Sequence, residues 1–280
     1  MLDITEKNRD WVFPVEERQF IPMGMTEPVQ GWKTLVRTDG EKDEVLHVCR
    51  DTYTMLSHDD VVNSTYDAVK KANISKDFEF DVRCVNSGRQ LEVEVLFNDL
   101  IIEPKKNDHI KYRIRAYNSL DGSFAYQTTA DAMRLFCMNG CTTPDAISKV
   151  WARHTSQIST EGGSAKIVRG LENFHNQKDV YQAWAKHKIA RDDAERFIKK
   201  CVVARSSKTS EEKHNQKQLE TLMGQLDTEF KTLNKTKWAL YNCLTHWATH
   251  TKETASPIRT TRHRENVIAK AMKTDMWETI

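Results

Sequence analysis

Five side chains in the segment 109–128 have the types and spacing of a surface that binds single-stranded nucleic acid. Strand-forming residues flank Asp121-Gly122, a dipeptide that favours a two-residue type I′ hairpin turn. Side chains alternate along a strand, so cations and a ring share one face, and the turn places a second ring opposite the first. Cations neutralise phosphates and aromatic rings stack on bases. The predicted contacts are Lys111, Arg113, Arg115, Tyr117 and Tyr126.

The same face has a second interpretation in which the cations serve the sheet alone. Glu92 and Glu94 lie on a predicted strand of the same sheet, and carboxylates on neighbouring strands pair with cations. Exposed pairs of this kind contribute about 1 kcal/mol or less to stability. The sequence leaves both interpretations open.

Basic residues also concentrate towards the end of the chain. Residues 1–108 hold 14 Lys and Arg against 22 Asp and Glu, a net charge of −8; the remainder holds 28 against 18, a net charge of +10. This gradient predicts a polyanionic partner for the second half, or attraction between the halves of different subunits. The last segment adds three candidate nucleic-acid contacts, Arg259, Arg262 and Arg264.

The sequence gives weaker support for a catalytic site or a metal site. The sequence contains no G-x-S-x-G elbow, H-E-x-x-H motif or phosphate-cradling loop, so we expect no enzyme, no catalytic residue and no cofactor. Cys137 and Cys141, with His154 further on, could supply part of a zinc site, but no second pair follows at suitable spacing, so we expect no metal. A nuclease built from distant acids stays open as a third reading.

Cys243, His246 and His250 share one face of a predicted helix. Trp238, Leu244 and Trp247 surround them in the sequence, which favours packed or half-exposed helix residues over a site.

The composition predicts a folded protein of the cytoplasm. Six scattered cysteines among 280 residues form no disulfide framework, which fits a reducing compartment. No apolar run approaches the roughly 20 residues that span a bilayer, and the acidic amino-terminal stretch differs from a signal peptide. We expect no membrane partner.

Apolar periodicity predicts an α+β fold: an antiparallel β-meander with a packed helix, followed by a mostly helical second half. The expected organisation is an irregular arm over 1–30, an α+β core over 31–160, a helical region over 161–256 and a basic tail over 257–280. Within the core, a hairpin over 32–37 and 45–48 precedes a helix that Ser57 caps, and a meander covers 78–129.

The period changes after Thr129. Residues 130–138 fit either a helix or an extended segment, and Pro144 favours a helix through Ala152. Further helices are expected over 167–188, 191–203, 211–233 and 237–249.

Three motifs resemble the phage- and plasmid-borne domain-of-unknown-function family nine-three-two. They are VNSGRQLEV, AYNSLDGSFAYQTTADAMRLFCMNG and WARHT, and TLVRTDG and HVCRDTYTMLSHDDV are similar to the hairpin and helix that precede them in the family. The resemblance covers 31–160 well and the helices loosely, and departs at Asn139-Gly140-Cys141, where many members have Asn-Thr-Leu.

The resemblance implies a phage setting, and a layout similar to single-strand annealing recombinases of the eukaryotic Rad type. The leading hypothesis is a DNA-metabolism protein, active in recombination in the host-cell cytoplasm, that binds single-stranded nucleic acid and anneals strands as a homo-oligomer. The alternative is a phage-encoded interaction or host-takeover protein that acts through its helical half.

Overall fold

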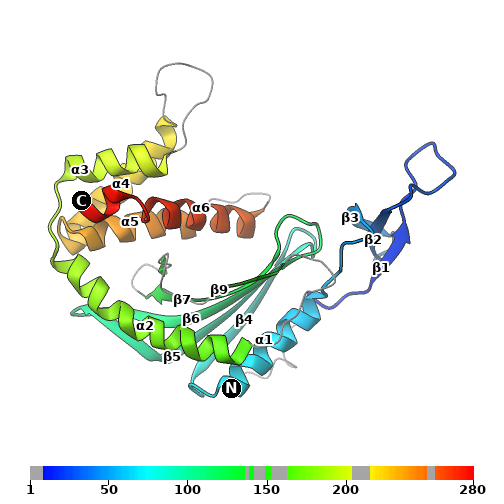
Figure 1. Ribbon diagram of the computed structural model, residues 1–280, viewed down its shortest axis with the longest axis horizontal. Helices are drawn as coiled ribbons and strands as arrows, with labels where there is room; N and C mark the ends of the chain where they lie inside the picture. The colour runs from blue at the N-terminus through cyan, green and yellow to red at the C-terminus, as the bar shows by residue number, and fades with distance from the viewer. Residues whose placement is uncertain (1–8, 136–138, 142–148, 153–162, 204–214, 251–255) are drawn as a thin grey trace. The chain divides into compact units, whose positions relative to one another are not determined.

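The computed structural model describes residues 9–135, 139–141, 149–152, 163–203, 215–250 and 256–280. They belong to two compact units, each built from several chain segments. Unit 1 comprises Met1–Phe97, Ile114–Ala130 and Ser148–Arg169; unit 2 comprises Asn98–Arg113, Asp131–Ile147 and Gly170–Ile280. Antiparallel strands come first and helices follow, which confirms the predicted α+β class (Figure 1).

Unit 1 contains a small antiparallel sheet in the order β1-β2-β3. Its strands are β1 (Val15–Gln19), β2 (Trp32–Arg37) and β3 (Glu44–Arg50). The β2–β3 hairpin confirms the prediction. The prediction that 1–30 is wholly irregular is wrong, because β1 pairs antiparallel with residues 33–37 of β2. Leu35, Leu46 and Cys49 pack with Leu120 in the core of this region.

The helix α1 (His58–Ala72) begins where the sequence predicts it. The Ser57 hydroxyl accepts a hydrogen bond from the Asp60 backbone N–H at 3.0 Å, and Asp59 and Asp60 lie in the first turn, where carboxylates favour the helix dipole. The helix ends at Asn73, which adopts the left-handed conformation.

A larger sheet has the order β4-β5-β6-β7-β8, and β9 also pairs with β7. Its strands are β4 (Phe78–Val85), β5 (Gln90–Lys105), β6 (Asp108–Ser119), β7 (Tyr126–Arg134), β8 (Asn139–Cys141) and β9 (Lys149–Ala152). Residues 130–134 are therefore extended rather than helical. The helix expected up to Ala152 is wrong for 149–152, because β9 pairs antiparallel with β7; the rest of that prediction falls outside the described residues.

The connection between β6 and β7 is longer than the predicted two-residue turn. It spans residues 120–125, and only Gly122 in it has a positive φ, so the type I′ turn is wrong. Side chains shape the loop instead. The Ser119 hydroxyl donates to the Phe124 carbonyl and accepts from its N–H, and the Asp121 carboxylate accepts from the Ser123 N–H.

Hydrogen bonds of buried side chains connect this loop and the end of β6 to the turn between β4 and β5 in unit 1. His58, 2% exposed, lies 2.9 Å from the Gly88 carbonyl through Nε2 and 3.0 Å from the Asn118 amide nitrogen through Nδ1. A carbonyl only accepts and an amide N–H donates, so the ring is neutral with its proton on Nε2. Gln90 also donates to Asp121 and Ser123. Residues of the two quoted motifs VNSGRQLEV and AYNSLDGSFAYQTTADAMRLFCMNG are thus structural partners in unit 1.

The second half of the chain is helical, as predicted. The last expected helix has the predicted bounds, while the basic segment after Pro257, expected as a tail, forms α6 and α7. The elements are α2 (Gly163–Lys186), α3 (Arg191–Phe197), the π-helix η2 (Ile198–Val202), α4 (Gln216–Leu233), α5 (Lys237–Thr249), α6 (Pro257–Ala271) and α7 (Asp275–Thr279). Helix α5 packs against α4 and α6 in unit 2 (Figure 1). It also contacts β8.

Aromatic rings fill the core of unit 2. Trp238 and Tyr241 are stacked with their centroids 5.4 Å apart, and Tyr181 stacks on Tyr241 at 5.8 Å. Trp184 meets Trp277 of α7 edge to face at 5.2 Å. Ring pairs of this kind add about 0.5–1.5 kcal/mol each beyond the area they bury, and they hold α2, α5 and α7 together.

A buried ion network joins strands and helices of unit 2. Arg134 of β7, 1% exposed, donates from Nε to Asp108 at 2.5 Å and lies 3.5 Å from Glu229 of α4. Asp108 also accepts from the Trp238 indole N–H at 2.8 Å, and Glu229 accepts from the Gln225 amide at 3.0 Å. Burial raises the pKa of Glu229, although the Arg134 guanidinium opposes this shift.

We predict that substitution of Arg134 destabilises the protein strongly, whereas substitution of Glu229 changes its stability little. Arg134→Met leaves two buried carboxylates without their cation and should cost about 3–5 kcal/mol of unfolding free energy. Glu229→Gln removes a charge that burial disfavours and should change stability at pH 7 by about 1 kcal/mol or less. The pKa of Glu229 is raised on folding, so its protonated form stabilises the folded state at low pH. This contribution to the unfolding free energy of the wild type is lost as pH rises above the ordinary pKa of 4.5. Glu229→Gln does not titrate and should not show this pH-dependent loss.

Denaturant unfolding at pH 5 and pH 8 measures both effects. Equal losses for the two variants would contradict this description of the network.

A second prediction concerns Gly88, which has φ +82 and would place a Cβ 2.9 Å from the Phe13 ring. Gly88→Ala should cost about 2–4 kcal/mol, from backbone strain together with overpacking. Gly24 is a matched control, because it has φ +83 with no neighbour within 4 Å. Gly24→Ala should cost only the strain, about 1–2 kcal/mol. Equal unfolding midpoints for the two variants would contradict the close contact at Gly88.

Candidate nucleic-acid interface

The arginines of the predicted hairpin site are buried and face carboxylates within the sheet. Arg113, 3% exposed, donates to Asp131 from Nε at 2.6 Å and from Nη2 at 3.2 Å. Arg115, also 3% exposed, lies 4.0 Å from Glu92, which pairs with Arg83 at 2.5 Å as well. The pairing with Glu92 that the second interpretation expected is therefore present.

The other hairpin residues are also engaged inside the protein. Lys111 donates to the Asn98 amide oxygen at 2.6 Å. Tyr117 is 1% exposed and Tyr126 is 4% exposed. The Tyr126 hydroxyl accepts a hydrogen bond from Thr128 at 2.9 Å, and burial raises its pKa. A strand could reach the arginines and rings only if these contacts opened. Nucleic-acid contact by this group stays a prediction.

The arginines predicted in the last segment lie on α6 in unit 2. Arg259 is exposed and Arg262 is half-buried, and with exposed Lys270 they follow one side of the helix, which we call the α6 basic row. Arg264 points to the adjacent side, where Thr260, His263, Arg264 and Val267 line a cavity.

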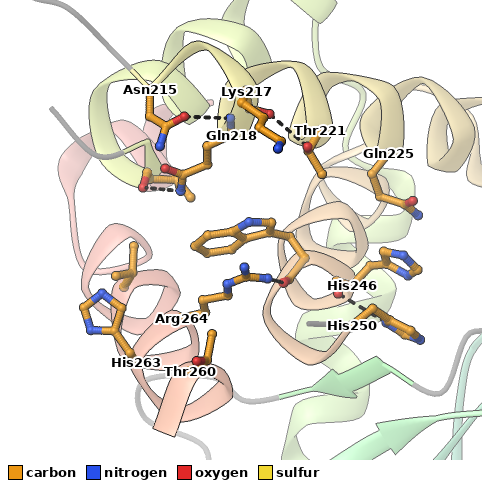
Figure 2. A pocket seen from close by; sticks show the side chains of 13 residues that line it. Asn215, Lys217, Gln218, Thr221, Gln225, His246, His250, Thr260, His263 and Arg264 are labelled. Atoms are coloured by element: carbon orange, nitrogen blue, oxygen red, sulfur yellow. Dashed lines mark hydrogen bonds between the residues drawn. The ribbon is translucent and has the colours of Figure 1, made fainter. Parts of the chain in front are cut away.

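This α4–α6 cavity has a volume of about 560 Å³, is partly open to solvent, and is lined by residues of α4, α5 and α6 with the ends of their neighbouring segments. Figure 2 shows Lys217 and Gln218 of α4 on one side and Arg264, His246 and His250 on the other. The described lining residues include no Asp or Glu. They are Val202, Asn215, Lys217, Gln218, Thr221, Gln225, His246, Trp247, His250, Thr260, His263, Arg264 and Val267.

The amino-terminal end of α4 borders the cavity. Asn215 caps this 18-residue helix by accepting from the Gln218 N–H at 3.0 Å, and the first turn carries no acidic residue. Lys217 is exposed there and has no ion pair among the described residues. The helix dipole adds partial positive charge at the same end.

Arg264 and Trp247 form the opposite wall. The Arg264 guanidinium donates from Nη1 to the Trp247 carbonyl at 2.7 Å and lies 4.7 Å from the centre of the Trp247 ring. Burial lowers the pKa of Arg264 below its ordinary value, but a guanidinium remains charged near pH 7.

His246 and His250 stack on each other with ring centroids 4.0 Å apart and planes 15° apart. Burial, and then the neighbouring His250, lowers the pKa of His246 to about 4, so His246 is neutral near pH 7. His250 is exposed, and its Nδ1 lies 3.2 Å from the His246 carbonyl. Cys243 is buried and His246 is half-buried on this helix, as predicted, whereas His250 is exposed.

Sequence reasoning named Arg264 but missed Lys217, His246, Trp247 and His250 as neighbours in one cavity. The aromatic and histidine run of α5 was visible, but its partner on α4 lies some thirty residues away and only the packing of three helices joins them.

No group of three potential metal ligands is found among the described residues, and Cys137 and His154 of the possible zinc site fall outside them. Among the helices that the structure describes, none has the length and apolar character to cross a membrane.

Comparison with known proteins gives one match. No curated protein and no solved structure matches the chain. The profile of a family described as Domain of unknown function (DUF932) matches residues 45–273, which runs from β3 to just beyond α6. The match thus extends well into the helices, beyond the 31–160 region where the motifs resemble the family best. The chain belongs to the DUF932 family.

Proposed function

We propose that this protein is a phage-encoded DNA-metabolism protein that binds single-stranded nucleic acid without catalysis. In this proposal it anneals strands as a homo-oligomer in the host cytoplasm, as recombinases of the annealing type do. The observation that carries the proposal is the α4–α6 cavity, which combines cations and rings with no carboxylate in its described lining. Phosphates and bases are the complementary chemistry.

The α6 basic row extends this surface beyond the cavity. A rise of about 1.5 Å per residue places Arg259 and Lys270 about 16 Å apart along the helix axis. Cations spread over that length could contact more than one phosphate of an extended strand. Binding through phosphates alone carries no sequence preference, which suits a protein that anneals arbitrary strands.

A protein partner is the second candidate function. Three apolar side chains in the loop between β1 and β2 favour it: Ile21, Met23 and Met25 are 49%, 104% and 55% exposed. Sequence analysis placed such a partner on the helical half, whereas this loop belongs to unit 1.

The main test is a binding titration with single-stranded DNA, duplex DNA and RNA across a salt series. Arg259→Ala should weaken single-strand binding and reduce the log–log salt slope by about 0.7, because one phosphate contact is lost. Lys186→Ala, which removes an exposed cation at the end of α2, is the matched control and should leave the slope unchanged. A wild-type slope for Arg259→Ala, or no binding by the wild type, would refute the proposal.

The hairpin arginines should behave differently from the α6 basic row. Arg113→Ala leaves Asp131, 0% exposed, without its cation, and should lower the unfolding free energy by about 3–5 kcal/mol. Below its unfolding transition the variant should keep the wild-type salt slope. A reduced slope with wild-type stability would instead return the binding site to the hairpin.

The proposal also predicts salt-sensitive assembly. The net charge of −8 on residues 1–108 and +10 on the remainder allows head-to-tail contacts between copies. Light scattering should detect an assembly larger than a dimer at low salt that dissociates as screening increases. A monomer at every salt concentration would rule out annealing by an oligomer.

A further inference from the structure

We infer that the α4–α6 cavity binds a nucleoside phosphate, with the phosphate between Lys217, the amino-terminal end of α4 and Arg264, and the base against the ring pair of His246 and His250. This inference rests on the proposed function in that it names the ligand of the same site. The nucleotide could be free or part of a strand, because the two share this chemistry.

The size of the cavity fits a ligand of this class. Its volume of about 560 Å³ falls inside the range of roughly 300–1,000 Å³ that small-molecule and cofactor sites occupy. Most of its residues come from α4, α5 and α6, with Val202 from η2, and α5 packs on both α4 and α6. All of them belong to unit 2, so the walls do not depend on the placement of unit 1.

The positive charge of the described lining residues favours an anionic ligand. Lys217 and Arg264 contribute two cations, and no described lining residue contributes a carboxylate to neutralise them. Backbone N–H groups in the first turn of α4 point out of the helix end, and Asn215 caps the N–H of Gln218. A phosphate at this helix end would accept hydrogen bonds from these groups and gain from the helix dipole.

Arg264 is already oriented for such a contact. Its hydrogen bond to the Trp247 carbonyl and its position over the Trp247 ring hold the guanidinium in place. Partial burial of this cation costs solvation energy, which a phosphate would recover through charge-assisted hydrogen bonds.

The rings distinguish a nucleotide from a simple anion. His246 and His250 form a nearly parallel stack with their centroids 4.0 Å apart, and His250 is an exposed residue. A base can extend this stack, because every base presents a π-face. The amides of Asn215, Gln218 and Gln225 line the same cavity and offer both donors and acceptors to the polar edge of a base.

The test is isothermal titration calorimetry of the full chain with deoxyadenosine monophosphate, deoxyadenosine and inorganic phosphate. Deoxyadenosine monophosphate should bind with one site per chain and at least about tenfold more tightly than either fragment. No heat of binding at millimolar nucleotide, or equal affinity for phosphate and nucleotide, would overturn the inference.

Two exposed positions provide variants that should fold normally. Lys217→Ala should weaken nucleotide and phosphate binding about tenfold, because a charge-assisted contact is lost. Lys231→Ala, an exposed lysine at the other end of α4 and outside the cavity, is the matched control and should bind as the wild type does. His250→Ala should weaken binding of the nucleotide but not of phosphate. Wild-type nucleotide affinity in Lys217→Ala or His250→Ala would place the ligand elsewhere.

A competition arm separates this inference from the proposed function. If oligonucleotides fail to bind while the mononucleotide binds and responds to Lys217→Ala, the proposed function fails and the cavity is a site for free nucleotides. If the mononucleotide displaces a bound oligonucleotide, the strand uses the cavity. If oligonucleotides bind and neither the mononucleotide nor Lys217→Ala has an effect, the inference fails and the strand binds without the cavity.

Discussion

The buried guanidinium of Arg134 is the group on which the arrangement of unit 2 depends. Arg134 is 1% exposed, and its charge is neutralised by Asp108 at the start of β6 and Glu229 on α4. The Trp238 indole N–H of α5 donates a hydrogen bond that holds Asp108 in position. Burying this cation without its carboxylates would lower the unfolding free energy by several kcal/mol. The folded state therefore requires β6, β7 and α4 to lie next to one another. Gln225 holds Glu229 and also lines the α4–α6 cavity. The same network therefore fixes one wall of the candidate site.

Elements specified by neighbouring residues could be predicted from the sequence. Ser57 caps α1 through a residue three positions away, and three successive positive φ angles at Asn86, Ser87 and Gly88 form the turn that their residue types favour. Strand β9 could not be foreseen, because its pairing with β7 depends on distant residues. Alternation likewise placed Arg113 and Arg115 on one face, but it could not show that Asp131 and Glu92 would be their neighbours.

The candidate site was predictable only in part, for the same reason. The basic character of α6 is local and was visible in Arg259, Arg262 and Arg264. The cavity requires α4, α5 and α6 to pack, so Lys217 and His250 gain their meaning from tertiary structure. The motifs that resemble the DUF932 family have other roles: Gln90, Asn118 and Arg134 make hydrogen bonds inside the two units. In this chain those residues therefore have structural roles, whereas the proposed ligand site is the α4–α6 cavity.

The central claim is that unit 2 binds nucleic-acid components through the α4–α6 cavity and the α6 basic row. Ultraviolet crosslinking of a single-stranded oligonucleotide to the full chain, with the modified peptides identified by mass spectrometry, tests it most directly. Aromatic and histidine side chains that stack on bases are the groups in position to crosslink. The account predicts crosslinks at Trp247, His250 or His263 that excess mononucleotide suppresses. Crosslinks confined to residues 109–134, with none in the helices, would contradict it.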